Sequence, residues 1–247
     1  MDENNDRRPD PKPRKHPYLW QAYLHWGELV KMRQRHMLRI SSIKKGKSNL
    51  SLAFEEHVLE HMGINELIND AKKVMIQHGE GIGPVWDWLT AIKGLKAGGL
   101  AAQLLAQIDD IGKFDTVSKL WMFSGWGLRD GQVVRCKSGE KSPYNRRLKS
   151  IGYLIMDQFV RQQTPLYADI YYDEKRRQRQ LHPEKIKGEN GKWKFNDGHI
   201  DNRARRKTIK IFLQHLWVNW RESEGLAVTE PYIQAIMGHT NIITNPM

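Results

Sequence analysis

The chain has 247 residues, enough for one substantial core or two small ones. Lys and Arg outnumber Asp and Glu by 40 to 28, which gives a net charge of +12, and 39% of the residues are hydrophobic. This composition excludes a disordered chain, and a single cysteine, Cys136, excludes an internal disulfide and argues against a cysteine-based zinc site. We therefore expect a folded protein of a reducing, cytoplasmic compartment whose charge attracts polyanions, nucleic acid first among them.

Residues 1 to 17 predict a flexible basic arm. Pro9, Pro11, Pro13 and Pro17 stand among Lys and Arg and prevent a packed helix. The segment lacks the apolar run of a signal peptide, and no stretch of the chain is apolar over the length needed to cross a bilayer. We expect no membrane partner.

Residues 18 to 80 predict a helical stalk or coiled-coil-like hairpin. Apolar residues recur at helical spacing from Leu19 to Ile40. Further helices are expected at about 50 to 62 and 66 to 77, with Gly63 and Gly79 at their ends.

Residues 81 to 225 predict a compact helical domain, so the fold class is all-α with little strand signal. Short apolar helices lead to a basic loop at 129 to 149 and a helix that ends near Thr164. A strongly charged stretch at 173 to 198 is expected to be an exposed, partly helical excursion. The last strong helix is expected at 203 to 222, and 226 to 247 form a tail.

The sharpest local pattern runs from Leu89 to Ala101. One helix is expected to end at Gly94, Leu95 to pack inside the turn, and a second helix to begin after Gly98. This resembles a helix-hairpin-helix motif, in which a glycine-rich turn lets backbone N–H groups approach a phosphate. Lys96 stands where the motif usually has a second glycine and would add a charge. The alternative is a helical corner inside the core.

Four blocks in order resemble the C-terminal serine domain of the insertion-sequence transposases called bridge recombinases. The hairpin leads into Ile108-Asp109-Asp110-Ile111-Gly112-Lys113-Phe114-Asp115, which is similar to the acidic turn of that family. Residues 120 to 128, Leu-Trp-Met-Phe-Ser-Gly-Trp-Gly-Leu, are similar to the next block. A Ser-Gly loop at Ser138 and Gly139 then precedes Asn145-Arg146-Arg147-Leu148, and a basic amphipathic helix closes the domain.

The resemblance implies that Ser138 attacks a DNA phosphodiester and becomes joined to it. A serine nucleophile needs a base or a cationic setting, and the phosphate needs positive partners. The basic loop and the start of the last helix are expected to line one positive face that binds the backbone of the nucleic acid. Its candidate residues are Arg129, Arg135, Lys137, Lys141, Arg146, Arg147, Lys149, Arg203, Arg205 and Arg206, with Gly94, Lys96 and Gly98 of the hairpin.

The family pairs this domain with an N-terminal RuvC-like acidic domain, for which residues 1 to 80 leave no room. We therefore expect a homo-oligomer or a partner subunit that carries the acidic domain. The alternative is a DNA- or RNA-binding accessory subunit without chemistry. DNA is the expected partner and RNA the second, and no cofactor is expected.

Two further patterns are short. His57 and His61 lie one helical turn apart, in the H-x-x-E-H spacing of inverted zinc proteases, but the neighbouring carboxylates indicate a solvated helix face, and we expect no metal. Gly238-His239 resembles the Gly-His box of tyrosine recombinases, but no tyrosine follows it, and we expect a chance likeness.

Overall fold

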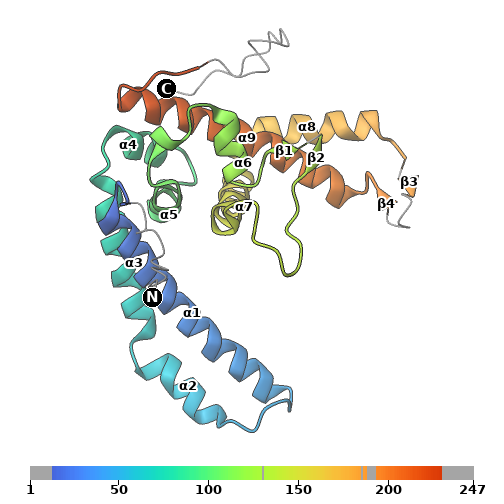
Figure 1. Cartoon of the computed structure of the whole chain (residues 1–247). Helices are drawn as coiled ribbons and strands as arrows, with labels where there is room; N and C mark the ends of the chain where they lie inside the picture. The colour runs from blue at the N-terminus through green and yellow to red at the C-terminus, as the bar shows by residue number, and fades with distance from the viewer. Residues whose placement is uncertain (1–12, 130, 185, 188–192, 230–247) are drawn as a thin grey trace, which may run out of the picture.

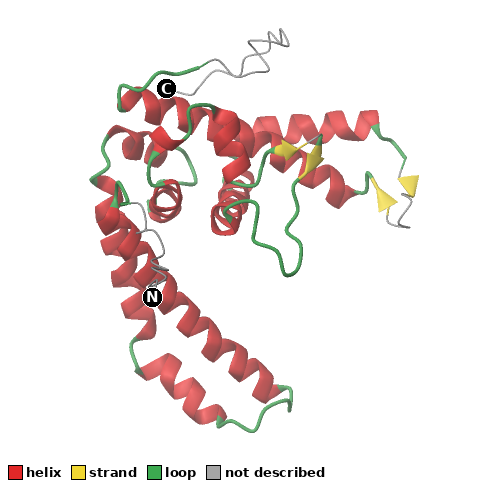
Figure 2. Cartoon of the chain, in the orientation of Figure 1, coloured by secondary structure: helices red, strands yellow, loops and turns green. Residues whose placement is uncertain are grey.

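The computed structural model describes residues 13–129, 131–184, 186–187 and 193–229. This part of the chain is all-α, as the sequence predicts, with two minimal strand pairs (Figure 2). The helices are α1 (Pro17–Lys44), α2 (Leu52–His61), α3 (Ile64–Glu80), α4 (Pro84–Ala91), α5 (Gly99–Ile108), α6 (Val117–Phe123), α7 (Arg146–Arg161), α8 (Tyr167–Leu181) and α9 (Asp197–Ser223). A 3-10 turn, η1 (Ile111–Lys113), precedes α6, and β1 (Leu128–Arg129) pairs antiparallel with β2 (Gln132–Val133), as β3 (Ile186–Lys187) does with β4 (Trp193–Lys194).

Helices α1, α2 and α3 form an arm that projects from the rest of the molecule (Figure 1). Ser51 caps α2 by accepting a hydrogen bond from the Phe54 amide at 3.3 Å. Gly63, with φ of +64°, then turns the chain into α3. A small cluster of Val58, Ile64 and Ile68 holds the outer end of the arm and is separate from the main core.

Helices α4 to α9 form the body, and α9 runs through it (Figure 1). Phe212, Trp217 and Trp220 of α9 are fully buried. The Trp217 indole also donates a hydrogen bond to the Phe114 carbonyl at 2.7 Å, so its polar atom is satisfied inside the core. This one helix therefore connects the segment after α5 with helices α4, α6, α7 and α8.

Helices α4 and α5 form the predicted hairpin, with Leu95 buried in the turn. Gly98 has φ of +71°, and a Cβ there would lie 2.9 Å from the Trp86 ring. Close packing and backbone conformation thus both require glycine at this position.

The charged stretch predicted as an exposed excursion at 173 to 198 differs in the structure. Its first part continues α8, which packs along α9 with Glu174 and Gln178 buried. Helix α9 begins at Asp197, before the predicted start at 203, because Asn196 accepts a hydrogen bond from the His199 amide at 2.8 Å and caps it. Several charges in this stretch pair between helices instead of facing water, which sequence periodicity does not reveal.

The predicted basic loop at 129 to 149 is shorter in the structure, because Asn145 caps α7 and the loop ends there. The boundaries predicted for the stalk and the compact domain remain predictions. Of the predicted basic arm, residues 1–12 lie outside the described residues, as do residues 230–247 of the predicted tail, with Gly238 and His239. No described helix has both the length and the apolar character that crossing a membrane requires.

Candidate nucleic-acid interface

Three half-buried cations lie close together between α7 and α9, and we call Lys149, Arg206 and Lys210 the cation cluster. The Lys149 ammonium lies 4.4 Å from the centroid of the Tyr144 ring. The Lys210 ammonium lies 4.0 Å from the centroid of the Trp121 ring. Aromatic faces therefore support both lysines, where most buried cations have a carboxylate.

The cation cluster is electrostatically uncompensated. Burial, together with repulsion from Arg206, lowers the pKa of both Lys149 and Lys210. Burial also lowers the pKa of Arg206 itself. In the part of the chain that the structure describes, none of the three forms an ion pair. Such an arrangement costs free energy unless an anion binds.

Packing fixes the aromatic supports of the cluster. The Trp121 indole donates a hydrogen bond to the Lys210 carbonyl at 2.9 Å, which ties α6 to α9. Trp126 packs closely against α7 because residue 152 is glycine, where a Cβ would stand 2.8 Å from the Trp126 Nε1. The Lys149 ammonium further donates to the Tyr144 hydroxyl at 3.4 Å.

Arg146 and Arg147 are exposed in the first turn of α7, beside the cluster in sequence. The Asn145 side chain accepts a hydrogen bond from the Leu148 amide at 3.0 Å and so caps the helix. The positive end of the helix dipole and both guanidinium groups thus meet at one end of α7. This is a favourable setting for a phosphate group.

Ser138 lies exposed in the turn of the loop between β2 and α7. Among the described residues no hydrogen bond or ion pair involves its side chain, and neighbouring Lys137 lies 3.6 Å from Glu140. The polar contacts of this loop lie elsewhere: the Cys136 thiol is 3.3 Å from the Ser142 hydroxyl, which donates to the Tyr144 carbonyl at 2.7 Å. The hydrogen bond between Cys136 and Ser142 is the largest cause of a lowered pKa of Cys136. The other predicted cations of the same segment are exposed, namely Arg129, Arg135 and Lys141.

Only one of the three cations that the sequence predicts at the start of α9 joins the cation cluster. Arg205 donates to Asp157 and to Asp201, each at 2.7 Å. Arg203 donates to the Gln178 amide oxygen at 2.6 Å. Of the predicted cations in this helix only Arg206 joins the cluster, because the others have partners on α7, α8 or α9 itself.

The turn of the hairpin is oriented inward. Gly94 packs against Gln158 and Thr164, and the Thr164 hydroxyl donates to the Lys93 carbonyl at 2.8 Å. The Gly98 amide donates within the turn, to the Leu95 carbonyl at 2.9 Å. Packing accounts for both glycines, while Lys96 is exposed. Phosphate binding by this turn remains a prediction.

Lys210 and the supporting rings belong to the candidate site but are not among the residues that the sequence analysis predicts for it. Lys210 follows Arg206 by one helical turn, so the two share a helix face, and this spacing was the available signal. Trp121 and Trp126 have the sequence surroundings of ordinary core residues.

In the described part of the chain, the zinc-protease pattern on α2 is not completed by further metal-ligating side chains. The His57 and His61 rings stack with centroids 4.6 Å apart. Across the described ranges no three His, Cys, Asp or Glu side chains are grouped to hold a metal ion.

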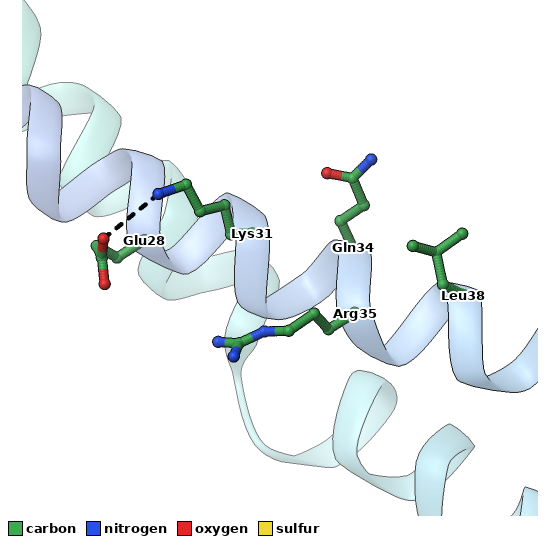
Figure 3. A pocket seen from close by; sticks show the side chains of 5 residues that line it. All are labelled: Glu28, Lys31, Gln34, Arg35 and Leu38. Atoms are coloured by element: carbon green, nitrogen blue, oxygen red, sulfur yellow. Dashed lines mark hydrogen bonds and ion pairs between the residues drawn. The ribbon is translucent and has the colours of Figure 1, made fainter. Parts of the chain in front are cut away.

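A surface hollow of about 370 Å³ on α1 is lined by side chains of that helix alone (Figure 3). Glu28 and Lys31 pair there at 3.5 Å, and Leu38 is exposed. Because Glu28 pairs with Lys31, the hollow lacks the concentrated positive charge of the cation cluster.

No protein-family model, no curated protein and no solved structure matches this chain.

Proposed function

We propose that this chain binds nucleic acid, with DNA as the preferred form, through a surface made of the cation cluster and the exposed Arg146 and Arg147. The observation that carries the proposal is the cation cluster itself. Three half-buried cations repel one another without a carboxylate partner in the described part of the chain. A phosphate backbone supplies the missing anions.

The whole chain supports a polymer in preference to a small anion. Its net charge of +12 exceeds what one phosphate or carboxylate would neutralise. Further exposed cations, Arg129, Arg135 and Lys141, lie on the segment that leads into α7. A polyanion that extends from the cluster can contact these residues in turn, and each contact releases counterions.

The test is fluorescence anisotropy with a labelled DNA duplex across a salt series. Replacing Lys149 and Arg206 by glutamine should weaken binding, and the slope of log K against log salt should fall by roughly 0.9 for each phosphate that the variant no longer neutralises. Arg176→Gln is the matched control, because Arg176 is exposed on α8 and pairs with Asp173. Equal losses of affinity in the control, or no duplex binding at low salt, would contradict the proposal.

Strand transfer by Ser138 is the second, more specific proposal, and it comes from the resemblance to the bridge recombinases. It is supported by the exposure of Ser138 on a loop that carries Arg135, Lys137 and Lys141. The competing proposal is an accessory subunit that binds without chemistry. The two differ in whether a covalent protein–DNA adduct forms.

A further inference from the structure

A second recess lies where the start of α1, the end of α5 and the start of α7 meet. It has a volume of about 400 Å³, within the range of about 300–1,000 Å³ that is usual for ligand pockets. Its walls come from segments far apart in the sequence. We call it the α1–α5–α7 pocket.

Planar groups line this pocket. The Arg14 guanidinium lies 3.5 Å from the centroid of the Trp20 ring. Phe123 also lines the pocket and is 37% exposed, and its ring lies 5.2 Å from that of buried Phe114. Guanidinium planes and aromatic rings are the two surfaces on which proteins stack unpaired bases.

One residue that lines the pocket has an unsatisfied hydrogen-bond donor. Gln107 lines it and is 5% exposed, and its Oε1 accepts a hydrogen bond from the side-chain Nδ2 of Asn145 at 2.8 Å. The orientation of Asn145 is fixed, because its own oxygen caps α7. The Gln107 Nε2 is therefore the free end, and it is buried without a partner among the described residues. A buried amide of this kind costs free energy unless an acceptor reaches it.

The charge in the pocket favours an electron-rich ligand. Asp109 is already occupied, because its carboxylate accepts from the Lys113 ammonium at 2.6 Å and from the His16 amide at 3.2 Å. Burial raises the pKa of Asp109, but these hydrogen bonds, above all that from Lys113, outweigh it and hold the pKa below its usual value. With Asp109 neutralised by Lys113, Arg14 remains as the excess charge. Asp109 also has φ of +67°, a strained conformation for a residue other than glycine.

The pocket adjoins the proposed phosphate-binding surface. Asn145 lines the pocket and caps α7, and the next residues are the exposed Arg146 and Arg147. A ligand with a planar ring and an attached phosphate can therefore place the ring among Arg14, Gln107 and Phe123 and the phosphate at the start of α7. That combination is a nucleotide.

We propose that the α1–α5–α7 pocket binds an unpaired nucleobase, with Gln107 donating to a carbonyl oxygen or ring nitrogen of the base and Arg14 and Phe123 stacking on it. The proposal deepens and rests on the proposed nucleic-acid binding. It adds a specific substrate class, namely strands with an unstacked base such as single strands, bulges or ends.

The experiment compares the full chain on two probes of equal length, a blunt duplex and a single strand that carries 2-aminopurine. We expect the single strand to bind more tightly and its fluorescence to be quenched. Phe123→Leu should reduce single-strand affinity by roughly 5- to 150-fold, the usual effect of losing one base–aromatic stack. Gln107→Leu should reduce it by roughly 2- to 13-fold, the usual effect of losing one hydrogen bond, and both variants should leave duplex affinity unchanged. Gln103→Leu is the control, because Gln103 is also buried on α5 but does not line the pocket.

The base-binding proposal is overturned if the single strand binds no better than the duplex, or if both pocket variants keep the preference for the single strand. In either case, binding of the duplex still supports the proposed function. If neither probe binds, the proposed function fails. Titration calorimetry with free deoxyadenosine monophosphate then tests whether the pocket binds a nucleotide. Binding that Gln107→Leu abolishes would retain it as a site for a free nucleotide. No heat of binding would overturn it.

Discussion

Helix α9 carries cations on two flanks, one toward α8 and one toward α6 and α7, and the surroundings of the two groups of cations are opposite. Toward α8, Lys207 donates to Glu174 at 2.8 Å and Arg203 to Gln178 at 2.6 Å. Toward α6 and α7, Lys210 lies over the Trp121 ring, and Arg206 repels both Lys210 and Lys149. One flank of the helix therefore uses its charge to hold the fold, and the other flank leaves its charge for a ligand.

This difference shows that a surplus of basic residues does not by itself locate a binding surface. Both flanks of α9 are basic in the sequence, and nothing in the pattern of charges separates them. Only the partners that the fold brings to each cation distinguish the two groups. The predictions below test that separation through stability, pH, charge removal and chemistry.

Removing Glu174 should have the largest effect. Its side chain is 6% exposed and accepts from Lys207, Arg177 and Gln178. Glu174→Ala should lower the free energy of unfolding by about 1.5–3 kcal/mol, the usual contribution of hydrogen bonds to a charged group. Urea denaturation measures this. Asp173→Ala breaks an exposed pair with Arg176 and should lower the free energy of unfolding by less than about 0.5 kcal/mol. Equal losses in the two variants would contradict the difference between the buried and the exposed pair.

Acid should weaken the contacts between α8 and α9. Burial raises the pKa of Glu174, but hydrogen bonds led by that from Lys207 outweigh it, so the pKa lies below its ordinary value of 4.5. A carboxylate with a depressed pKa contributes stability above its unfolded pKa and loses it as the pH falls through the folded value. Wild-type stability should therefore decline below about pH 4.5, and Glu174→Gln should decline less steeply. Parallel pH profiles would contradict this role.

Removing Arg206 should act in the opposite direction on stability. Arg206→Met keeps an apolar stem and relieves repulsion with Lys149 and Lys210. The free energy of unfolding at low salt should stay within about 0.5 kcal/mol of wild type or rise, while DNA affinity falls. A loss above about 1 kcal/mol in urea denaturation would mean that Arg206 stabilises the fold through contacts of its own.

Replacing Ser138 should have the smallest effect on the folded protein. The side chain is exposed in a loop, so Ser138→Ala should change the free energy of unfolding by less than about 0.5 kcal/mol and leave duplex affinity unchanged. Under the recombinase proposal it should abolish covalent adducts, detected as a DNA-dependent band shift in denaturing gels. Wild-type protein that forms no adduct on any transposon-end substrate would favour the accessory-subunit proposal, and Ser138→Thr serves as the conservative comparison.

The helical architecture was largely predictable, because apolar periodicity and glycine stops mark most helices. The apolar spacing from Leu19 to Ile40 predicts α1, and Gly63 marks a real boundary, whereas α4 ends at Ala91, three residues before the predicted stop at Gly94. The second half of α8 was not predictable in this way, since the run from Glu174 to Arg179 is charged almost throughout. Its burial depends on Glu174 meeting Lys207 of another helix, and single-sequence patterns carry no information on such distant pairing.

The candidate site was predictable in part. Basic residues in the loop and at the start of α7 mark the segments that carry the candidate site, although Lys149, which the sequence places in the loop, lies with Arg146 and Arg147 in the first turn of a helix. The sequence did not distinguish Arg205, which two carboxylates neutralise, from its neighbour Arg206. Nor did it indicate Gln107, whose role depends on the cap at Asn145, a residue far along the chain.

The small hydrophobic cluster of the arm has a consequence for how the molecule opens. Val58, Ile64 and Ile68 are its buried members, and they form a group separate from the main core of the described chain. Large apolar side chains along the outer half face solvent: Met37, Leu38, Leu50, Phe54 and Met62. Amide hydrogens of α2 should exchange with solvent far sooner than those of α9, by local opening that leaves the body folded. The tip of the arm can thus unfold and refold many times within one lifetime of the folded body.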